Sequence, residues 1–163
     1  MRLIRQFAAY AVFFVFVLTL SAAPELRLLA DGEAVVSLSF SHAAKRIGEC
    51  KRLSQEELQA LPPNMRTPDE CPRERHTLHF EFFVDDELAY ATTLSPSGLW
   101  KDGKTTIYQR LRIPSGSHLM RIRMKDSGRE EGFDFDDSAR VDLAAEQNLV
   151  VFFDAANQRF QFR

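Results

Sequence analysis

The stretch that decides the fold is Ile107 to Met124, which reads IYQRLRIPSGSHLMRIRM. On each side of the central Pro-Ser-Gly, apolar side chains recur at every second position, which is the period of a β-strand with one buried face. The apolar positions are Ile107, Leu111 and Ile113 before the turn, and Met120, Ile122 and Met124 after it. Polar residues, mostly arginine, fill many alternate positions, so the stretch predicts an antiparallel hairpin with one dry and one wet face.

The same period of two recurs along much of the chain from residue 34 onward. It is clearest at 36–40 and 78–84, and shorter runs of β-forming residues lie at 88–93, 149–153 and 159–162. Turn signals rich in Asp, Gly, Pro, Ser and Asn separate these runs. Together with the two arms of the hairpin they make about seven short strands. The sequence therefore predicts an all-β domain, an antiparallel Ig-like β-sandwich.

Residues 102–118, DGKTTIYQRLRIPSGSH, with the alternating LMRIRM that follows, resemble the second half of a PEGA-type β-sandwich module. The resemblance covers about 25 residues, and the chain lacks the start of such a module. It implies a non-catalytic binding or spacer domain associated with a bacterial envelope. The whole chain also resembles an uncharacterised family of small membrane-anchored bacterial proteins, and that resemblance implies no function.

The N-terminus has the pattern of an export segment. Arg2 and Arg5 precede Phe7 to Ala23, which carry no charge. A cleaved signal peptide and a retained transmembrane helix both fit this pattern. Ser21 and Ala23 have the small-x-small spacing of a cleavage site, but Pro24 follows directly and obstructs cutting, which favours retention.

The basic flank predicts the N-terminus in the cytoplasm and the rest of the chain on the far side of the inner membrane, in the periplasm. We therefore expect a single-pass anchor at 1–23, a linker at 24–33 and a periplasmic β-sandwich at 34–163. The part after the anchor is mildly acidic, because without Arg2 and Arg5 it has 19 basic and 23 acidic residues, a net charge of −4. Nucleic acid is therefore not an expected partner.

An insertion between the first two strands departs from the strand pattern. Ser54 and Glu57 form a capping box, which predicts a short helix from Ser54 to Ala60. Cys50 and Cys71 flank this helix and could form a disulfide, a redox pair or metal ligands. We favour the disulfide, because two cysteines in an exported domain are expected to pair and their spacing is not that of a thiol-disulfide catalyst. We expect the disulfide-closed insertion to lie flat against one sheet edge.

The chain offers few groups for chemistry, so we expect no enzyme. A metal or haem carrier is the alternative function, using His42, His76, His79, His118, Met65, Met120 and Met124. Their spacing forms no recognisable ligand cluster, so we expect no cofactor. In the acidic segment 126–137, Asp134 and Asp136 either ligate Ca²⁺ or belong to a solvated hairpin loop, and the second interpretation is favoured.

Two exposed segments are the candidate contacts for a protein partner. The segment 61–76 offers Arg66, Arg73, Arg75 and His76, whose guanidinium groups can bind carboxylates or simply pair with neighbouring glutamates. The turn 95–103 carries Trp100, as a hot spot for binding or as a plug for one end of the sandwich. The sequence thus predicts a protein-binding accessory or assembly factor for an envelope or membrane protein complex.

Overall fold

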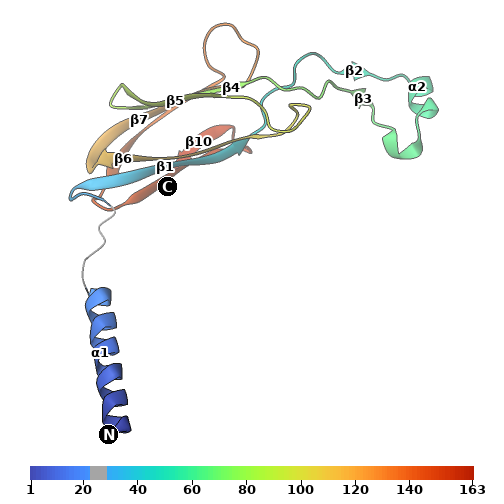
Figure 1. Cartoon of the computed structure of the whole chain (residues 1–163). Helices are drawn as coiled ribbons and strands as arrows, with labels where there is room; N and C mark the ends of the chain where they lie inside the picture. The colour runs from blue at the N-terminus through green and yellow to red at the C-terminus, as the bar shows by residue number, and fades with distance from the viewer. Residues whose placement is uncertain (23–28) are drawn as a thin grey trace. The chain divides into compact units, whose positions relative to one another are not determined.

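The computed structural model describes residues 1–22 and 29–163 and divides the chain into two units, Met1–Ala30 and Asp31–Arg163 (Figure 1). Helix α1 (Arg2–Ala22) has 21 residues. At about 1.5 Å per residue it is roughly 30 Å long, the thickness of a bilayer's hydrocarbon core. Its length and composition suit a membrane span or a signal sequence. The expected cleavage site after Ala23 and residues 24–28 of the expected linker lie outside the described residues.

The second unit is a β-sandwich, so the all-β expectation is confirmed. One sheet has the strand order β10-β9-β1-β6, and the other has the order β5-β4-β7-β8. The strands are β1 (Glu33–His42), β4 (Leu78–Val84), β5 (Glu87–Leu94), β6 (Thr105–Pro114), β7 (Gly116–Lys125), β8 (Phe135–Leu143), β9 (Asn148–Asp154) and β10 (Arg159–Phe162). The expected hairpin is β6 and β7, but its arms belong to different sheets, so the chain crosses between layers at Ser115.

Two features of the topology differ from expectation. Strand β8 was not among the seven predicted strands, because its inward position Asp137 interrupts an otherwise apolar face. The sandwich is also not wholly antiparallel, since β1 runs parallel to β9 with Val36 opposite Leu149. The side-chain period specifies a strand but not the direction of its neighbour.

The core fills the space between the sheets with the alternate residues that the period of two selects. Phe40, Phe80 and Phe160 form its aromatic centre, with ring centroids 5.2 to 6.0 Å apart. Strand β1 departs from the one-wet-face expectation. Its outward residues Val35 and Ser37 are also buried, and the Ser37 hydroxyl donates to Asn148 Oδ1 at 2.8 Å. This burial fits the central place of β1, between β9 and β6.

Asp137 closes one side of the sandwich. It points inward from the edge strand β8, and its Oδ2 accepts a hydrogen bond from the backbone N–H of Phe160 at 2.8 Å. Phe160 belongs to β10, the edge strand of the other sheet. The carboxylate therefore joins two sheet edges that would otherwise offer free donors and acceptors to other chains.

Candidate functional site

The insertion between β1 and β4 is the part of the domain least explained by the sandwich. It contains β2 (Lys51–Arg52), β3 (Asp69–Glu70), α2 (Gln55–Ala60) and the 3₁₀ turn η1 (Pro63–Met65). Figure 1 shows these elements extending away from the two sheets, and β2 and β3 pack mainly on one another. The expectation that the insertion lies flat against a sheet edge is therefore wrong, because no strand of the sandwich packs substantially against it.

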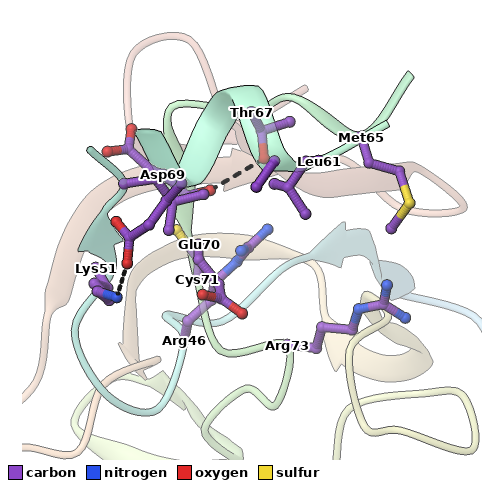
Figure 2. Close-up of a pocket in the computed structure, with 12 residues that line it drawn as sticks. Arg46, Lys51, Leu61, Met65, Thr67, Asp69, Glu70, Cys71 and Arg73 are labelled. Atoms are coloured by element: carbon purple, nitrogen blue, oxygen red, sulfur yellow. Dashed lines mark hydrogen bonds and ion pairs between the residues drawn. The ribbon is translucent and has the colours of Figure 1, made fainter. Parts of the chain in front are cut away.

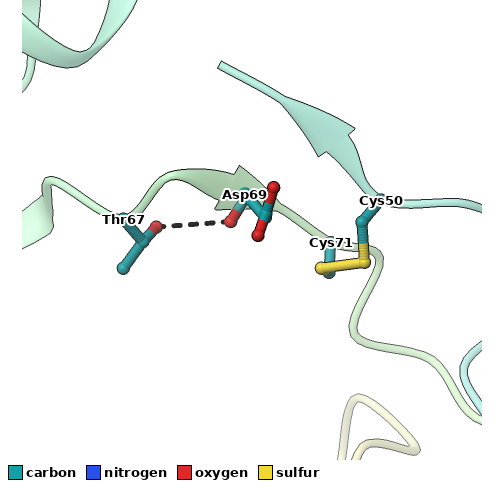
Figure 3. Close-up of a disulfide and its surroundings, with 4 residues drawn as sticks. All are labelled: Cys50, Thr67, Asp69 and Cys71. Carbon is teal, nitrogen blue, oxygen red and sulfur yellow. Dashed lines mark hydrogen bonds between the residues drawn. A yellow bond between two sulfur atoms is a disulfide. The ribbon is translucent and has the colours of Figure 1, made fainter.

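A disulfide closes the base of this projection. Cys50 and Cys71 are bonded, with 4.2 Å between their Cα atoms, directly before β2 and directly after β3 (Figure 3). The two-residue ladder pairs Lys51 with Glu70 and Arg52 with Asp69. A ladder this short has little stability of its own, so the covalent link holds the two strands in register. The expected pairing of the two cysteines is confirmed.

Helix α2 begins as the capping box predicts. The Glu57 backbone N–H donates to Ser54 Oγ at 3.2 Å, and the Ser54 backbone N–H donates to Glu57 Oε2 at 2.8 Å. Lys51 Nζ donates to the other oxygen of Glu57 at 2.6 Å. The lysine contact and the bonds from Ser54 lower the pKa of Glu57 to about 2. Glu57 therefore carries its charge at any physiological pH and links β2 to the helix.

Arg66, one of the expected partner contacts, lies at the other end of α2. Its Nε donates to the carbonyl of Leu61 at 3.0 Å, and its Nη2 donates to the carbonyl of Gln59 at 3.3 Å. Carbonyls at a helix C-terminus lack partners within the helix, and basic side chains commonly satisfy them. Arg66 therefore has a local role in terminating the helix, while its side chain stays exposed.

An open pocket of about 890 Å³ lies between the elements of the insertion and its base (Figure 2). Its apolar lining comes from Leu53, Ala60, Leu61 and Met65, and its charged lining from Arg46, Lys51, Glu57, Asp69, Glu70 and Arg73. Helix α2 buries no residue, and Met65 is 59% exposed. The insertion is thus held in shape by hydrogen bonds and a disulfide while its apolar side chains remain accessible.

Arg75 ties the base of the insertion to the neighbouring loop. Its Nε donates to the carbonyl of Asp102 at 2.9 Å, and its Nη1 donates to the carbonyl of Ala44 at 2.7 Å. Its backbone N–H donates to the carbonyl of Lys101 at 3.0 Å. One arginine therefore joins both legs of the insertion to the turn that carries Trp100. Its donors serve the backbone rather than neighbouring glutamates.

The turn itself presents two large apolar side chains to solvent. Leu99 is 89% exposed and Trp100 is 68% exposed, so Trp100 does not plug the end of the sandwich. The turn is fixed from within, because the Ser97 hydroxyl donates to the carbonyl of Lys104 at 2.8 Å. A weak ion pair of 3.7 Å between Lys101 and Glu74 adds a second link to the insertion.

A buried polar cluster, which the sequence did not reveal, lies where β1 leads into the insertion. His42 Nε2 is 2.7 Å from Asp126 Oδ2, and Lys45 Nζ is 3.1 Å from Asp134 Oδ1. Both carboxylates are almost fully buried. Burial alone would raise the pKa of Asp134, but hydrogen bonds from Ser127, Lys45 and the Asp126 amide outweigh it and lower that pKa to about 2. The expectation of a solvated acidic loop is therefore wrong at these two positions.

Aromatic rings enclose this cluster. The His42 ring lies 4.8 Å from Phe153 and 5.8 Å from Phe135, both edge to face. The backbone joins in, because the N–H of Lys45 donates to the carbonyl of Asp126 at 2.9 Å. The first leg of the insertion is thus attached to the segment that precedes β8.

His76 packs against the same segment and does not reach freely into solvent. A Cβ atom added at Gly128 would lie 2.6 Å from His76 Cε1, so the glycine backbone covers the imidazole. The His76 backbone N–H donates to the carbonyl of Lys45 at 2.9 Å. His76 therefore contributes to the attachment of the insertion's second leg.

Gly128→Ala is expected to lower the free energy of unfolding by about 1–3 kcal/mol, because the new methyl group must displace the His76 ring. Chemical denaturation of the full chain in detergent measures the change. The same substitution made in a His76→Ala background should cost much less, since the ring is gone. Equal costs in both backgrounds would show that the two residues are not in contact.

The groups that the alternative function of a metal carrier would use are not brought together. The four histidines lie with different partners, which are Asp126 for His42, Gly128 for His76, Thr93 for His79, and Asp85 with Pro114 for His118. Met120 and Met124 are fully buried in the core, whereas Met65 is exposed in the insertion. Asp136 forms a two-point ion pair with Arg121, apart from Asp134. Within residues 1–22 and 29–163, no group of three or more His, Cys, Asp or Glu side chains could hold a metal ion.

The structure thus gathers the expected partner contacts into one region. Arg75 joins the insertion to the turn of Trp100, Arg73 lines the pocket, and Arg66 and His76 stabilise the insertion itself. The buried anchoring cluster was missed because its members are far apart in sequence, with 84 positions between His42 and Asp126. Comparison of the chain with protein-family models, curated proteins and solved structures found no match.

Proposed function

We propose that the chain is a non-catalytic accessory or assembly protein of the bacterial cell envelope. Helix α1 anchors it in the cytoplasmic membrane, and the β-sandwich lies in the periplasm. The insertion and the Leu99-Trp100 turn together bind a protein partner. The apolar helix and the disulfide support this location, because disulfides persist in oxidising compartments.

The observation that carries the proposal is an organised projection with no core of its own. The insertion is fixed by a disulfide, a capping box and Arg75, yet α2 buries no side chain. Ordering the insertion costs conformational entropy, and the insertion buries no side chains of α2 that would offset this cost. Pre-organised loops that expose apolar groups on a rigid scaffold are typical binding surfaces, because little further entropy is lost when the partner arrives.

The turn of Trp100 provides the anchor residue for such a contact. Tryptophan is enriched among the few interface residues that dominate binding energy. Trp100 is exposed in the turn that Arg75 joins to the insertion. Arg46 and Arg73 line the pocket, and neither guanidinium has an ion pair within the described part of the chain. They are available to carboxylates of the partner.

Trp100→Ala is expected to weaken partner binding by at least about 30-fold, the loss of roughly 2 kcal/mol typical of a hot spot. The full chain is purified from membranes in mild detergent, and proteins that co-purify are quantified. Leu88→Ala is the matched control, because Leu88 is 52% exposed on β5. Circular dichroism checks that both variants stay folded. Equal recovery of partner with both variants would refute the proposed surface.

A further inference from the structure

The outer face of the β10-β9-β1-β6 sheet has an organisation that partner binding through the insertion does not use. The register places Arg110 of β6 beside Ser37 of β1, and Ser37 beside Val150 of β9. Arg163 continues this row, because its backbone exchanges hydrogen bonds with Val150. A second row begins with Tyr108 beside Ser39. Small side chains on β1 thus separate long arginine side chains at the two sheet margins.

This face is basic although the chain as a whole is acidic. Four exposed arginines lie on it, and none has an ion pair within the described residues: Arg110, Arg112, Arg159 and Arg163. Two carboxylates, Glu33 and Asp154, share this face, so its four arginines leave it with a net positive charge. Asp154 lies opposite Arg159 and accepts hydrogen bonds from Asn157 and Gln161. The chain's net charge is −2, so the basic character is local.

On the outer face of the other sheet, most arginines are paired with carboxylates. On its outer side, Arg121 pairs with Asp136 and Arg123 pairs with Glu81, each at 2.5 Å. Arg123 also lies over the rings of Phe83 and Phe133, 4.6 and 4.5 Å from their centroids. Arg140 of β8 is the one outer arginine of this sheet without an ion pair among the described residues, against four on the first sheet. The first sheet's outer face therefore has the larger number of arginines available to bind anions.

Aromatic side chains accompany the free charges. Tyr108 is 70% exposed in the middle of β6. Arg163 lies over the ring of Phe152, 5.3 Å from its centroid. Arginine binds phosphate oxygens through two parallel hydrogen bonds, and tyrosine is enriched at the level of lipid headgroups. A surface with both groups suits a phosphate-bearing interface with an apolar layer beneath it.

A short connection limits the distance between the β-sandwich and an anchored helix α1. Only residues 23–32 separate α1 from β1. Ten residues span at most about 35 Å when fully extended, so an anchored chain cannot carry its β-sandwich far from the bilayer. Even weak attraction between a basic face and anionic headgroups then acts at high effective concentration.

We propose that the outer face of the β10-β9-β1-β6 sheet docks on the anionic phosphate headgroups of the lipid bilayer. This inference rests on the proposed anchorage by α1 but not on partner binding, which uses different residues. Docking turns one sheet face toward the membrane.

Hydroxyl-radical footprinting of the full chain in vesicles tests the docking. The vesicles contain phosphatidylcholine alone, or with about one third phosphatidylglycerol. We expect labelling of Tyr108 to fall several-fold in the anionic vesicles and to recover at high salt, because salt screens the attraction. Trp100 is the internal reference, since it is 68% exposed and lies outside the basic face. Its labelling should not change.

Two double variants distinguish docking by this face from a general effect of the protein's positive charge. In the double variant Arg110→Gln with Arg112→Gln, the ratio of docked to free protein should fall about 25-fold. Each arginine near an anionic surface contributes a factor of about five to this ratio. Arg121→Gln with Arg140→Gln removes the same charge from the other sheet and should leave Tyr108 protected. Loss of protection in both pairs would overturn the inference.

Two further outcomes would overturn the inference. Tyr108 labelled equally in both lipid mixtures would show that the face does not dock. Protection of Tyr108 that is equal in neutral lipid and grows with protein concentration would assign the face to a second copy of the chain. Partner recovery with Trp100→Ala is measured separately in detergent, so failure of docking and failure of the proposed function can be distinguished.

Discussion

Cys50→Ser combined with Cys71→Ser is expected to lower the free energy of unfolding by about 3 kcal/mol and to abolish partner capture. The disulfide spans 21 positions, and closing a loop of this size restricts the unfolded chain by about that amount. The loss of order within the insertion is expected to be larger than the loss of stability of the whole domain. Without the bond, only the β2 and β3 ladder and the capping box hold the insertion together.

Limited trypsin digestion measures the local effect, since Arg52 and Arg66 both lie between the two cysteines. Chemical denaturation of the full chain in detergent measures the global one. In the double variant, cleavage at these arginines should accelerate strongly while the sandwich stays resistant. Thiol labelling of the unreduced parent protein provides the control. Free thiols in that protein, or unchanged capture by the double variant, would contradict the role given to the disulfide.

His42→Ala is expected to destabilise the domain by about 3–5 kcal/mol. The substitution leaves the Asp126 carboxylate buried without its closest partner, and removing one member of a buried pair typically costs this much. Asp126 Oδ1 already lacks a hydrogen bond, and Lys45 Nζ is 3.7 Å from it. The substitution also removes the edge-to-face contacts of the imidazole with Phe135 and Phe153.

Denaturation with urea compares this variant with His79→Ala. His79 bonds only to the hydroxyl of Thr93 across the β4–β5 pair, so its loss should change stability by less than about 0.5 kcal/mol. A similar small effect for both histidines would mean that the buried cluster contributes little. A large loss for His42→Ala with faster cleavage in the insertion would show that the cluster also anchors the projection.

Local sequence patterns predicted the features that depend on neighbouring residues. The alternation in 78–84 and 107–124 gives strands β4, β6 and β7, and the Ser54 and Glu57 pair gives the start of α2. The two cysteines predicted the closed insertion because the chain contains no other cysteine with which either could pair. Each of these predictions depends either on a few neighbouring residues or on cysteine, which occurs only twice in the chain.

Features that depend on distant residues were not predictable in this way. The sequence pattern does not predict strand β8, because Asp137 interrupts its apolar face. The partner of Asp137 is the N–H of Phe160, 23 positions later. The sequence also indicates a solvated Asp134, whereas in the structure it pairs with Lys45, 89 positions earlier. The partner of a buried charge cannot be inferred from its own neighbourhood.

The parallel pairing of β1 with β9 sets the order in which the domain can be completed. Ser37 and Asn148, which bond across this pair, are separated by 111 positions. Strand β1 is the first strand of the chain, yet nearly the whole chain must be present before both of its edges are paired. Pairings of such long range slow folding and prolong exposure of an unpaired edge. Strand β1 therefore stays incompletely paired for longest, whereas the 50–71 loop can close early and independently.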